Sequence, residues 1–250
     1  MAAPAGGDVI PGRRAVLEAL RAGRPIRKIL IARTAHGRVM HDLTAEARRR
    51  GAVVQYVHPR ALDELSAMPH QGVVALTAVH RGVALADILA AAASRGEPPL
   101  VLVLDGVEDP RNLGALIRTA DAAGAHGVVI PGRRAAGLSP AVARASAGAV
   151  AHVPVAVVGN LVQAIEELKA SGVWVAGADP QDGELYTTAR LSPPLALVMG
   201  GEGRGLGRLV KEHCDLLVRL PMRGKVASLN VAVAAGVLLF EAVRQMEQRR

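Results

Sequence analysis

The segment Asp105-Gly-Val-Glu-Asp-Pro-Arg-Asn-Leu-Gly-Ala-Leu-Ile-Arg118 follows an entirely apolar run at residues 100–104. An apolar run of this length, without polar alternation, is typical of a parallel strand that is buried on both faces. Within the segment, Leu113, Leu116 and Ile117 recur at the spacing of one helical face. The segment therefore predicts a buried strand, a polar loop and a helix that packs back on the strand.

The same alternation of strand and helix patterns continues to the end of the chain. A long helix is expected from about residue 228, and short apolar runs typical of strands occur at residues 128–130, 153–157, 173–176, 195–199 and 216–220. Repeated strand–helix units build a mostly parallel sheet with helices on both faces. Residues 98–250 are therefore expected to form an α/β domain of this kind.

The sequence before residue 98 has the pattern of a second, smaller α/β domain. A helix is expected at residues 10–22, and strands at residues 26–32, 53–57 and 73–79. The stretch Ser94-Arg-Gly-Glu-Pro-Pro99 is the most linker-like part of the chain, because Gly and Pro interrupt regular structure. We expect a domain at residues 9–80, a linker at residues 81–97 and the larger domain at residues 98–250.

The net charge of +8 is distributed unevenly. Residues 1–97 carry 14 Lys and Arg against 8 Asp and Glu, a net of +6, and residues 98–250 carry 16 against 14, a net of +2. Such an excess suits a polyanion, because each neutralised phosphate releases counterions; a proteome rich in Arg is the alternative explanation. One Phe, one Trp and two Tyr are too few for a base-stacking surface. Binding of RNA would therefore depend on guanidinium groups, backbone contacts and shape.

Several classes of protein are not expected. No apolar run approaches the roughly 20 residues of a membrane-spanning helix, and residues 1–7 lack the basic start and apolar core of a signal peptide. A single cysteine, Cys214, excludes an intramolecular disulfide and a thiolate zinc site, and no His-Glu-x-x-His pattern is present. The sequence predicts a soluble, cytoplasmic protein without a membrane partner and without a metal.

Two further segments rich in Gly and polar residues follow predicted strands. They are Leu197-Val-Met-Gly-Gly-Glu-Gly-Arg-Gly-Leu206 and Leu220-Pro-Met-Arg-Gly-Lys-Val-Ala-Ser-Leu-Asn230. In parallel α/β sheets, ligands bind outside the carboxyl ends of the strands. Neither segment fits a nucleotide motif, because no window reads G-x-G-x-x-G and Gly224-Lys225 is followed by Val226. With residues 105–118, they form the candidate site.

Taken in this order, the three segments resemble the three motifs of the SpoU (TrmH) family of RNA ribose 2′-O-methyltransferases, in the SPOUT superfamily. The matching residues are Asp109-Pro-Arg-Asn-Leu-Gly114 with Arg118, Met199-Gly-Gly-Glu-Gly203, and Pro221-Met with Ser228-Leu-Asn230. The first domain resembles the small substrate-binding domain of the family at Gly12, Ala15-Val16 and His70-Gln-Gly-Val73. The resemblance covers about residues 9–247 and is closest to the RlmB-type enzymes, which act on 23S ribosomal RNA.

This resemblance implies a SPOUT domain whose C-terminal chain is threaded into a trefoil knot, with S-adenosylmethionine as the cofactor. Gly200, Leu220 and Leu229 match the positions where the family binds this cofactor, largely through backbone groups and apolar contact. A glycine at position 200 suits that role, because it lets a ligand approach the main chain. The resemblance also implies a homodimer.

The catalytic residues implied by the resemblance are Asn112, Arg118, Glu202, Ser228 and Asn230. Arg118 corresponds to the residue nearest the ribose hydroxyl. A guanidinium stays protonated in proteins, so we expect Arg118 to orient the ribose and stabilise developing negative charge rather than to act as a base. Glu202 is a candidate to hold Arg118 through a charge-assisted fork. For Asn112, Ser228 and Asn230, helix capping is the alternative role.

The expected reaction is methylation of a ribose 2′-hydroxyl, on a guanosine of 23S ribosomal RNA. One alternative keeps the reaction and makes tRNA the substrate. A second alternative is a non-catalytic ribosome-assembly factor that binds RNA. The appended N-terminal domain favours ribosomal RNA, and the intact set of five catalytic positions favours an enzyme.

Overall fold

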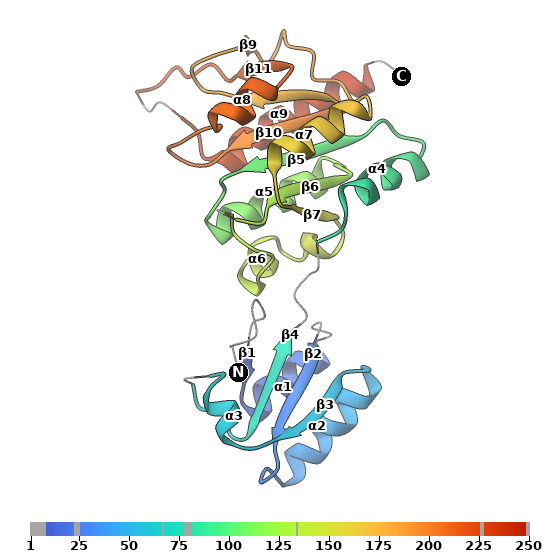
Figure 1. Ribbon diagram of the computed structural model, residues 1–250, viewed down its shortest axis with the longest axis vertical. Helices are drawn as coiled ribbons and strands as arrows, with labels where there is room; N and C mark the ends of the chain where they lie inside the picture. The colour runs from blue at the N-terminus through green and yellow to red at the C-terminus, as the bar shows by residue number, and fades with distance from the viewer. Residues whose placement is uncertain are drawn as a thin grey trace. The chain divides into compact units, whose positions relative to one another are not determined.

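A computed structural model of the protein describes residues 9–22, 26–66, 68–77, 82–133, 135–225 and 228–248. The chain divides into two compact units, Met1–Arg81 and Gly82–Arg250, each with its own sheet (Figure 1). We describe each unit by itself.

The first unit contains a four-stranded sheet in the order β1-β4-β2-β3. Its strands are β1 (Val9–Pro11), β2 (Ile26–Ala32), β3 (Val53–Val57) and β4 (Val73–Thr77). Strands β2 and β3 are parallel, whereas β4 runs antiparallel to β1 and β2. The expectation of a helix from residue 10 is wrong, because Val9–Pro11 pairs with β4 and helix α1 (Arg13–Arg21) begins only after Gly12.

Helices cover both faces of this sheet. Helices α1 and α2 (Arg38–Arg49) bury an apolar stripe against one face, with Leu20 and Leu43 fully buried beside Ile29 and Ile31. On the other face lies the short helix α3 (Arg60–Asp63), whose Leu62 packs with Leu30 and Val74. The first unit therefore has a core of its own.

The second unit contains a seven-stranded sheet in the order β7-β6-β5-β10-β8-β11-β9. Its strands are β5 (Leu100–Asp105), β6 (Gly127–Pro131), β7 (Val155–Val158), β8 (Trp174–Ala178), β9 (Glu184–Leu185), β10 (Leu195–Gly200) and β11 (Leu216–Arg219). All of the strand pairs within this sheet are parallel. The predicted parallel sheet is confirmed, and the two-residue strand β9 is an addition that the sequence patterns do not show.

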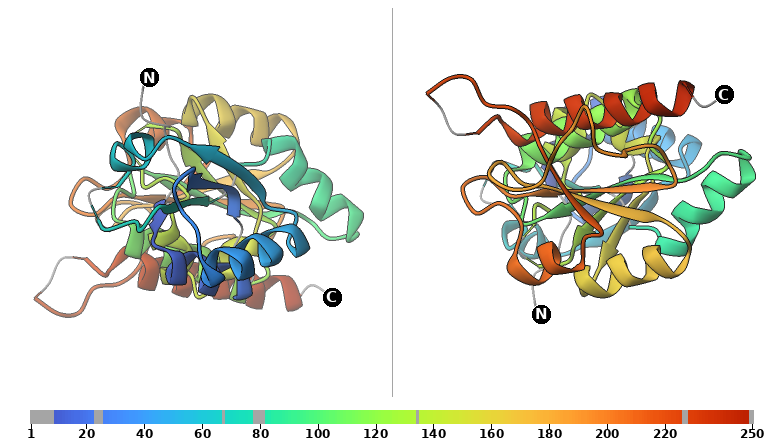
Figure 2. Two further views of the ribbon diagram at one scale, coloured as in Figure 1. Left: turned by 90° about the horizontal axis from the view of Figure 1, so that it is seen from below. Right: turned by 90° about the horizontal axis from the view of Figure 1, so that it is seen from above.

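The helices of this unit lie on both faces of the sheet, as expected (Figure 2). Helices α5 (Pro110–Ala122), α6 (Pro140–Ala145) and α9 (Val231–Glu247), with a short 3-10 helix at Ala149–Ala151, belong to one apolar core. Helices α4 (Leu85–Ser94), α7 (Leu161–Ala170) and α8 (Arg208–His213) belong to the core on the other face. Helix α4 occupies most of the stretch expected to be a linker, because Leu85 and Ile88 pack into this second core.

Among the described residues, no helix is both long and apolar enough to cross a membrane. The trefoil knot stays a prediction.

Candidate functional site

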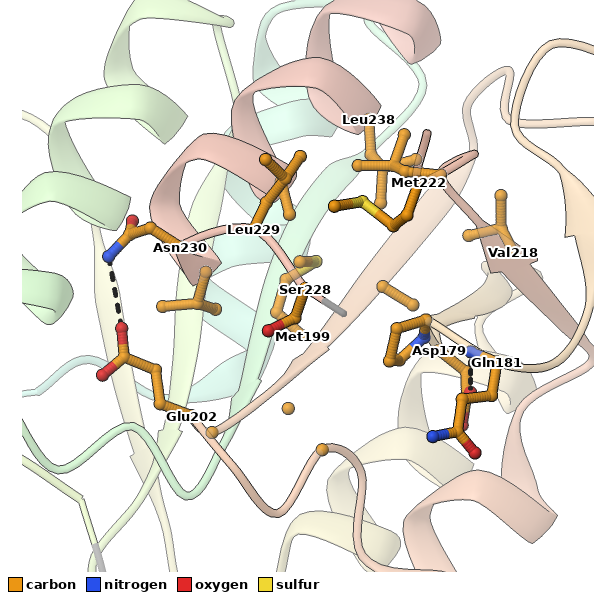
Figure 3. A pocket seen from close by; sticks show the side chains of 18 of the residues that line it. Asp179, Gln181, Met199, Glu202, Val218, Met222, Ser228, Leu229, Asn230 and Leu238 are labelled. Atoms are coloured by element: carbon orange, nitrogen blue, oxygen red, sulfur yellow. Dashed lines mark hydrogen bonds between the residues drawn. The ribbon is translucent and has the colours of Figure 1, made fainter. Parts of the chain in front are cut away.

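A cavity of about 500 Å³ opens at the carboxyl ends of the neighbouring strands β10, β8 and β11 (Figure 3). It is lined by Ala178, Asp179, Pro180, Gln181, Met199, Gly200, Gly201, Glu202, Gly203, Gly205, Val218, Leu220, Met222, Ser228, Leu229, Asn230, Val231, Ala234 and Leu238. This volume lies in the range of small-molecule sites. The lining combines apolar side chains, such as Met199 and Leu238, with polar ones, such as Glu202 and Asn230, so the cavity suits a ligand with both kinds of surface.

The Gly-rich loop at residues 200–207 forms one wall of the cavity and folds back on itself. Gly201 and Gly205 form an isolated antiparallel bridge. A Cβ atom on Gly200 would overlap the carbonyl group of Gly205, and one on Gly201 would overlap the carbonyl oxygen of Gly106. Glycine at position 200 is therefore required by the packing of the loop itself, in addition to any approach of a ligand.

The opposite wall is the turn at residues 179–181, which follows β8. The Asp179 carboxylate accepts hydrogen bonds from the backbone amides of Gln181 and Asp182, and from the Lys211 ammonium at 2.8 Å. Burial alone would raise the pKa of Asp179, but these hydrogen bonds hold the pKa below its usual value. The turn is thus tied to helix α8, and the Gln181 side chain lies beside the cavity (Figure 3).

Asn230 connects the three predicted motifs. Its Oδ1 accepts hydrogen bonds from the amides of Ala232 and Val233 and so caps helix α9. Its Nδ2 donates to Asn112 Oδ1 at 3.1 Å and to Glu202 Oε1 at 3.2 Å; Figure 3 shows the second bond. Asn230 therefore both caps helix α9 and takes part in the polar cluster, because its Oδ1 and its Nδ2 have different partners.

The capping alternative is wrong for the other two residues. Asp109 caps helix α5 by accepting from the amide of Arg111, and Asn112 lies within the first turn. Ser228 precedes the cap of α9 and lines the cavity instead. Asn112 and Ser228 thus present their side chains to the site region rather than to a helix end.

The structure brings together seven of the eight residues named from the sequence. Gly200, Leu220, Leu229 and Ser228 line the cavity, as do Glu202 and Asn230, which the hydrogen bond from Asn230 links to Asn112. The eighth, Arg118, is exposed on helix α5, six residues beyond Asn112.

Arg118 differs from the expectation in one respect. Within the described part of the chain, no ion pair joins Arg118 to Glu202, and the carboxylate of Glu202 accepts from Asn230 instead. The expected fork between the two is therefore not present. The Arg118 guanidinium is exposed on helix α5, and none of the described carboxylates forms an ion pair with it.

The turn at residues 179–181 was not among the segments singled out from the sequence. Its position directly after an apolar run was an available signal, because ligands bind beyond the carboxyl ends of parallel strands. Residues 179–182 themselves contain no glycine, although Gly177 and Gly183 flank them, so this stretch is less conspicuous than the Gly-rich loops. Met222, which also lines the cavity, lies within a segment that the sequence did indicate.

Two other sources of chemistry at such a site would be metal ligands and the single cysteine. Among the residues that the structure describes, no three His, Cys, Asp or Glu side chains gather as metal ligands would. Burial raises the pKa of the Cys214 thiol to about 11, so this cysteine is protonated near neutral pH.

Comparison with protein families matches both units of the chain. Residues 99–240 match the SpoU rRNA Methylase family, and residues 9–83 match the domain described as RNA 2'-O ribose methyltransferase substrate binding. A Bacillus subtilis protein, YacO, assigned to the TrmH family of tRNA/rRNA methyltransferases, is 47% identical over 95% of this chain and 96% of its own length.

Solved structures with similar folds include enzymes of both substrate classes. An rRNA methyltransferase from Sinorhizobium meliloti with bound AdoMet superposes with a TM-score of 0.66 and 30% identity, covering 96% of this chain and 87% of that chain. A TrmH/SpoU tRNA-modifying enzyme from A. aeolicus superposes with a TM-score of 0.55 and 28% identity, covering 61% of this chain and 78% of that chain. The relatives are thus methyltransferases that act on RNA.

Proposed function

Because the chain belongs to the SpoU rRNA methylase family, we propose that it methylates the 2′-hydroxyl of a guanosine ribose in 23S ribosomal RNA, with S-adenosylmethionine as methyl donor. The observation that carries the proposal is the hydrogen-bonded cluster of Asn112, Asn230 and Glu202 at the rim of a cavity lined by two of the family's motifs. The assignment to the RlmB-type enzymes within the family is part of this proposal.

The cavity has the chemical character that S-adenosylmethionine requires. Its apolar side, with Met199, Leu220 and Leu238, offers contact for an adenine ring, and the loop at 200–203 offers backbone groups. Gly200 and Leu229 complete the set of residues that we assign to the cofactor. When bound there, the cofactor supplies an activated methyl group.

The chain's own residues would handle the ribose. An alcohol is a weak nucleophile until its proton leaves or its developing negative charge is stabilised. Arg118 is the one exposed cation among the eight assigned residues, and a planar guanidinium can hold a ribose oxygen and an adjacent phosphate together. We assign Arg118 to orientation and charge stabilisation. Asn230 holds Glu202 and Asn112 in a common geometry, and Ser228 adds a hydroxyl to the wall of the cavity.

The extent of the structural similarity supports ribosomal RNA over tRNA as the substrate. The S. meliloti rRNA enzyme matches 96% of this chain and therefore both units, whereas the tRNA-modifying enzyme from A. aeolicus matches 61% of it. The first unit also carries most of the basic excess. We propose that residues 9–80 bind RNA and that residues 98–250 carry out methyl transfer.

A homodimer is part of the proposal. On helix α9, Val233, Val237 and Phe240 are 53%, 37% and 51% exposed, while Ala235 and Leu239 on the other side are fully buried. The three exposed residues recur at the spacing of one helical face, and uncovered apolar surface of this kind marks an interaction site. A second copy that covers this face would lie next to helix α5, which packs on α9 and carries Arg118.

The test is transfer of a radioactive methyl group from S-adenosylmethionine to ribosomal RNA and, separately, to tRNA, followed by mapping of the labelled nucleotide. We expect label in a single guanosine ribose of 23S ribosomal RNA. Label in tRNA instead would show that tRNA is the substrate. Binding of both cofactor and RNA without transfer would support the non-catalytic alternative.

A further inference from the structure

The first unit carries two clusters of arginines at opposite ends of its sheet. Strands β1, β2 and β3 all run in one direction, and the chain turns at their carboxyl ends toward helices α1, α2 and α3. Strand β4 begins at that same edge, because it is antiparallel to β1 and β2. We call this the loop edge: residues 12–14, 33–38, 58–60 and 70–72.

The loop edge is basic. Arg14, Arg33, Arg38 and Arg60 are exposed there, and exposed His36 and His58 lie in the same loops. The first turns of α1 and α2 contain no acidic residue. The nearby carboxylate of Asp63 accepts from His70 rather than from an arginine. Among the described residues, these four arginines have no carboxylate partner.

Arg13 differs from its neighbours, because it builds the loop edge. Its Nε donates to the carbonyl oxygen of Gln71 at 2.8 Å and its Nη1 to that of His36 at 3.0 Å. The amide of Ala32 donates to Gly72 in the same region. These bonds tie the loops into one surface, so the four exposed arginines are held on a connected scaffold.

The cluster at the other end is partly neutralised. Arg49 and Arg50 both pair with Glu46, and Arg21 pairs with Glu18. Arginines that already have carboxylate partners gain less from a phosphate, because the existing pair must be given up. Of the arginines described at this end, only Arg48 has no carboxylate partner, whereas all four exposed arginines of the loop edge lack one.

We propose that the loop edge of the first unit is the surface that docks the sugar–phosphate backbone of the RNA substrate, with Arg14, Arg33, Arg38 and Arg60 contacting phosphates. The proposal rests on the proposed function, because it takes RNA as the partner. Guanidinium groups bind phosphate bidentately and suit a surface that has few aromatic side chains for stacking. The arginines come from three loops, which fits a folded RNA backbone better than a single extended strand.

The test compares two charge-reversal variants of the full-length protein. Arg14→Glu with Arg38→Glu changes the first turns of α1 and α2 at the loop edge. Arg21→Glu with Arg48→Glu changes the last turns of the same two helices and alters the net charge equally. Glutamate is favourable near a helix N-terminus and unfavourable near its C-terminus, so the loop-edge variant should be the more stable of the two. A loss of RNA binding that is larger in the loop-edge variant than in the control is then not explained by unfolding.

The readouts are the affinity for a fluorescein-labelled fragment of 23S ribosomal RNA at several salt concentrations, and the KM and kcat of methyl transfer. We expect the loop-edge variant to bind RNA at least about tenfold more weakly, with the slope of log affinity against log salt reduced by about two. Its KM for RNA should rise while kcat and S-adenosylmethionine affinity stay within about twofold. The control variant should lose much less affinity.

Equal losses in the two variants, or a larger loss in the control, would overturn the docking surface while leaving the methyltransferase function intact. So would unchanged RNA affinity in both. A wild-type protein that binds S-adenosylmethionine but methylates no RNA would instead contradict the proposed function. An acidic polyglutamate peptide serves as the second probe. Binding of this peptide at the loop edge as tight as that of RNA would overturn the assignment to RNA.

Discussion

The carboxylate of Asp105 accepts a hydrogen bond of 2.7 Å from the backbone amide of Gly207, which lies 102 residues further along the chain. Asp105 ends strand β5, and Gly207 ends the Gly-rich loop that walls the cavity. At the start of the same loop, Gly201 packs so closely on Gly106 that a side chain at position 201 would overlap the Gly106 carbonyl. The turn after β5 therefore helps to determine the shape of the cavity wall that the Gly-rich loop forms.

Removal of this bond should weaken cofactor binding. Asp105→Ala leaves the Gly207 amide without its acceptor, and hydrogen bonds to charged groups are worth about 1.5–3 kcal/mol. We expect S-adenosylmethionine affinity by calorimetry to fall about tenfold or more. Asp105→Asn keeps an acceptor oxygen in place and should bind within a few fold of wild type. Equal losses in the two variants would show that the charge, rather than the hydrogen bond, matters.

The two roles of Asn230 can be separated by substitution. Asp caps helices as well as Asn does, so Asn230→Asp should keep the stability of helix α9. It loses the amide donor that ties Asn112 to Glu202 and places a second carboxylate beside Glu202. We expect methyl transfer to fall by more than tenfold with a nearly unchanged melting temperature. Asn230→Ala should in addition lose about 1 kcal/mol of stability. Full turnover in Asn230→Asp would show that Asn230 serves only as a helix cap.

Arg118 is expected to act through its shape as well as its charge. Since it is exposed and has no carboxylate partner among the described residues, Arg118→Ala should leave the melting temperature and S-adenosylmethionine affinity nearly unchanged. It should abolish nearly all methyl transfer. Arg118→Lys should also fail, because an ammonium cannot reproduce the planar fork of a guanidinium. Near-normal turnover of the Lys variant in the radioactive assay would contradict the orienting role.

Cofactor binding and RNA binding should be divided between the two units. Each has its own apolar core, so residues 82–250 should fold alone. This fragment should bind S-adenosylmethionine like the full chain but methylate RNA with a much higher KM. Its RNA affinity should also depend less steeply on salt, because the first unit carries most of the basic excess. Equal salt slopes for the fragment and the full chain would place the RNA contacts in the second unit.

The strands of the large sheet could be predicted from sequence because they are buried on both faces. The run at β5 is apolar at every position except the last, so it stands out in a single sequence. Strand β1 gives no such signal: its three residues belong to a sheet only because Val9 and Ile10 pair with β4, more than sixty residues later. Non-local pairing of this kind leaves no local pattern.

The site could be predicted only in part for a similar reason. The three motifs lie in loops whose glycines and polar residues are visible in the sequence. The turn containing Asp179 joins them because β8 lies between β10 and β11 in the sheet, and this order does not follow the chain. The hydrogen bonds of Asn230 likewise join residues 118 and 28 positions apart. The order of the motifs indicated that these residues act together. Which side chains form hydrogen bonds with each other could be seen only in the folded structure.

Ala235 is not a suitable position at which to test the dimer. Ala235 has a small side chain on helix α9, and small side chains allow a partner helix to approach closely. In the structure Ala235 is fully buried in the core of its own subunit. Ala235→Arg should therefore unfold the second unit, because it forces a charge and a large volume into a packed core. Loss of the dimer in that variant would say nothing about the interface.

Phe240→Glu tests the interface directly. Phe240 is 51% exposed and continues the apolar face formed by Val233 and Val237, so a carboxylate there costs little in a monomer but much in a covered interface. We expect wild type to be a dimer at micromolar concentration by light scattering, and Phe240→Glu to be a folded monomer with an unchanged melting temperature. Activity should fall with the dimer, since helix α9 packs on helix α5, which carries Arg118. Leu209→Glu is the matched control, because Leu209 is 53% exposed on helix α8, on the other face of the sheet, and should stay dimeric and active. An active monomeric wild type, or a Phe240→Glu dimer with full turnover, would refute the assignment of this face to a second copy of the chain.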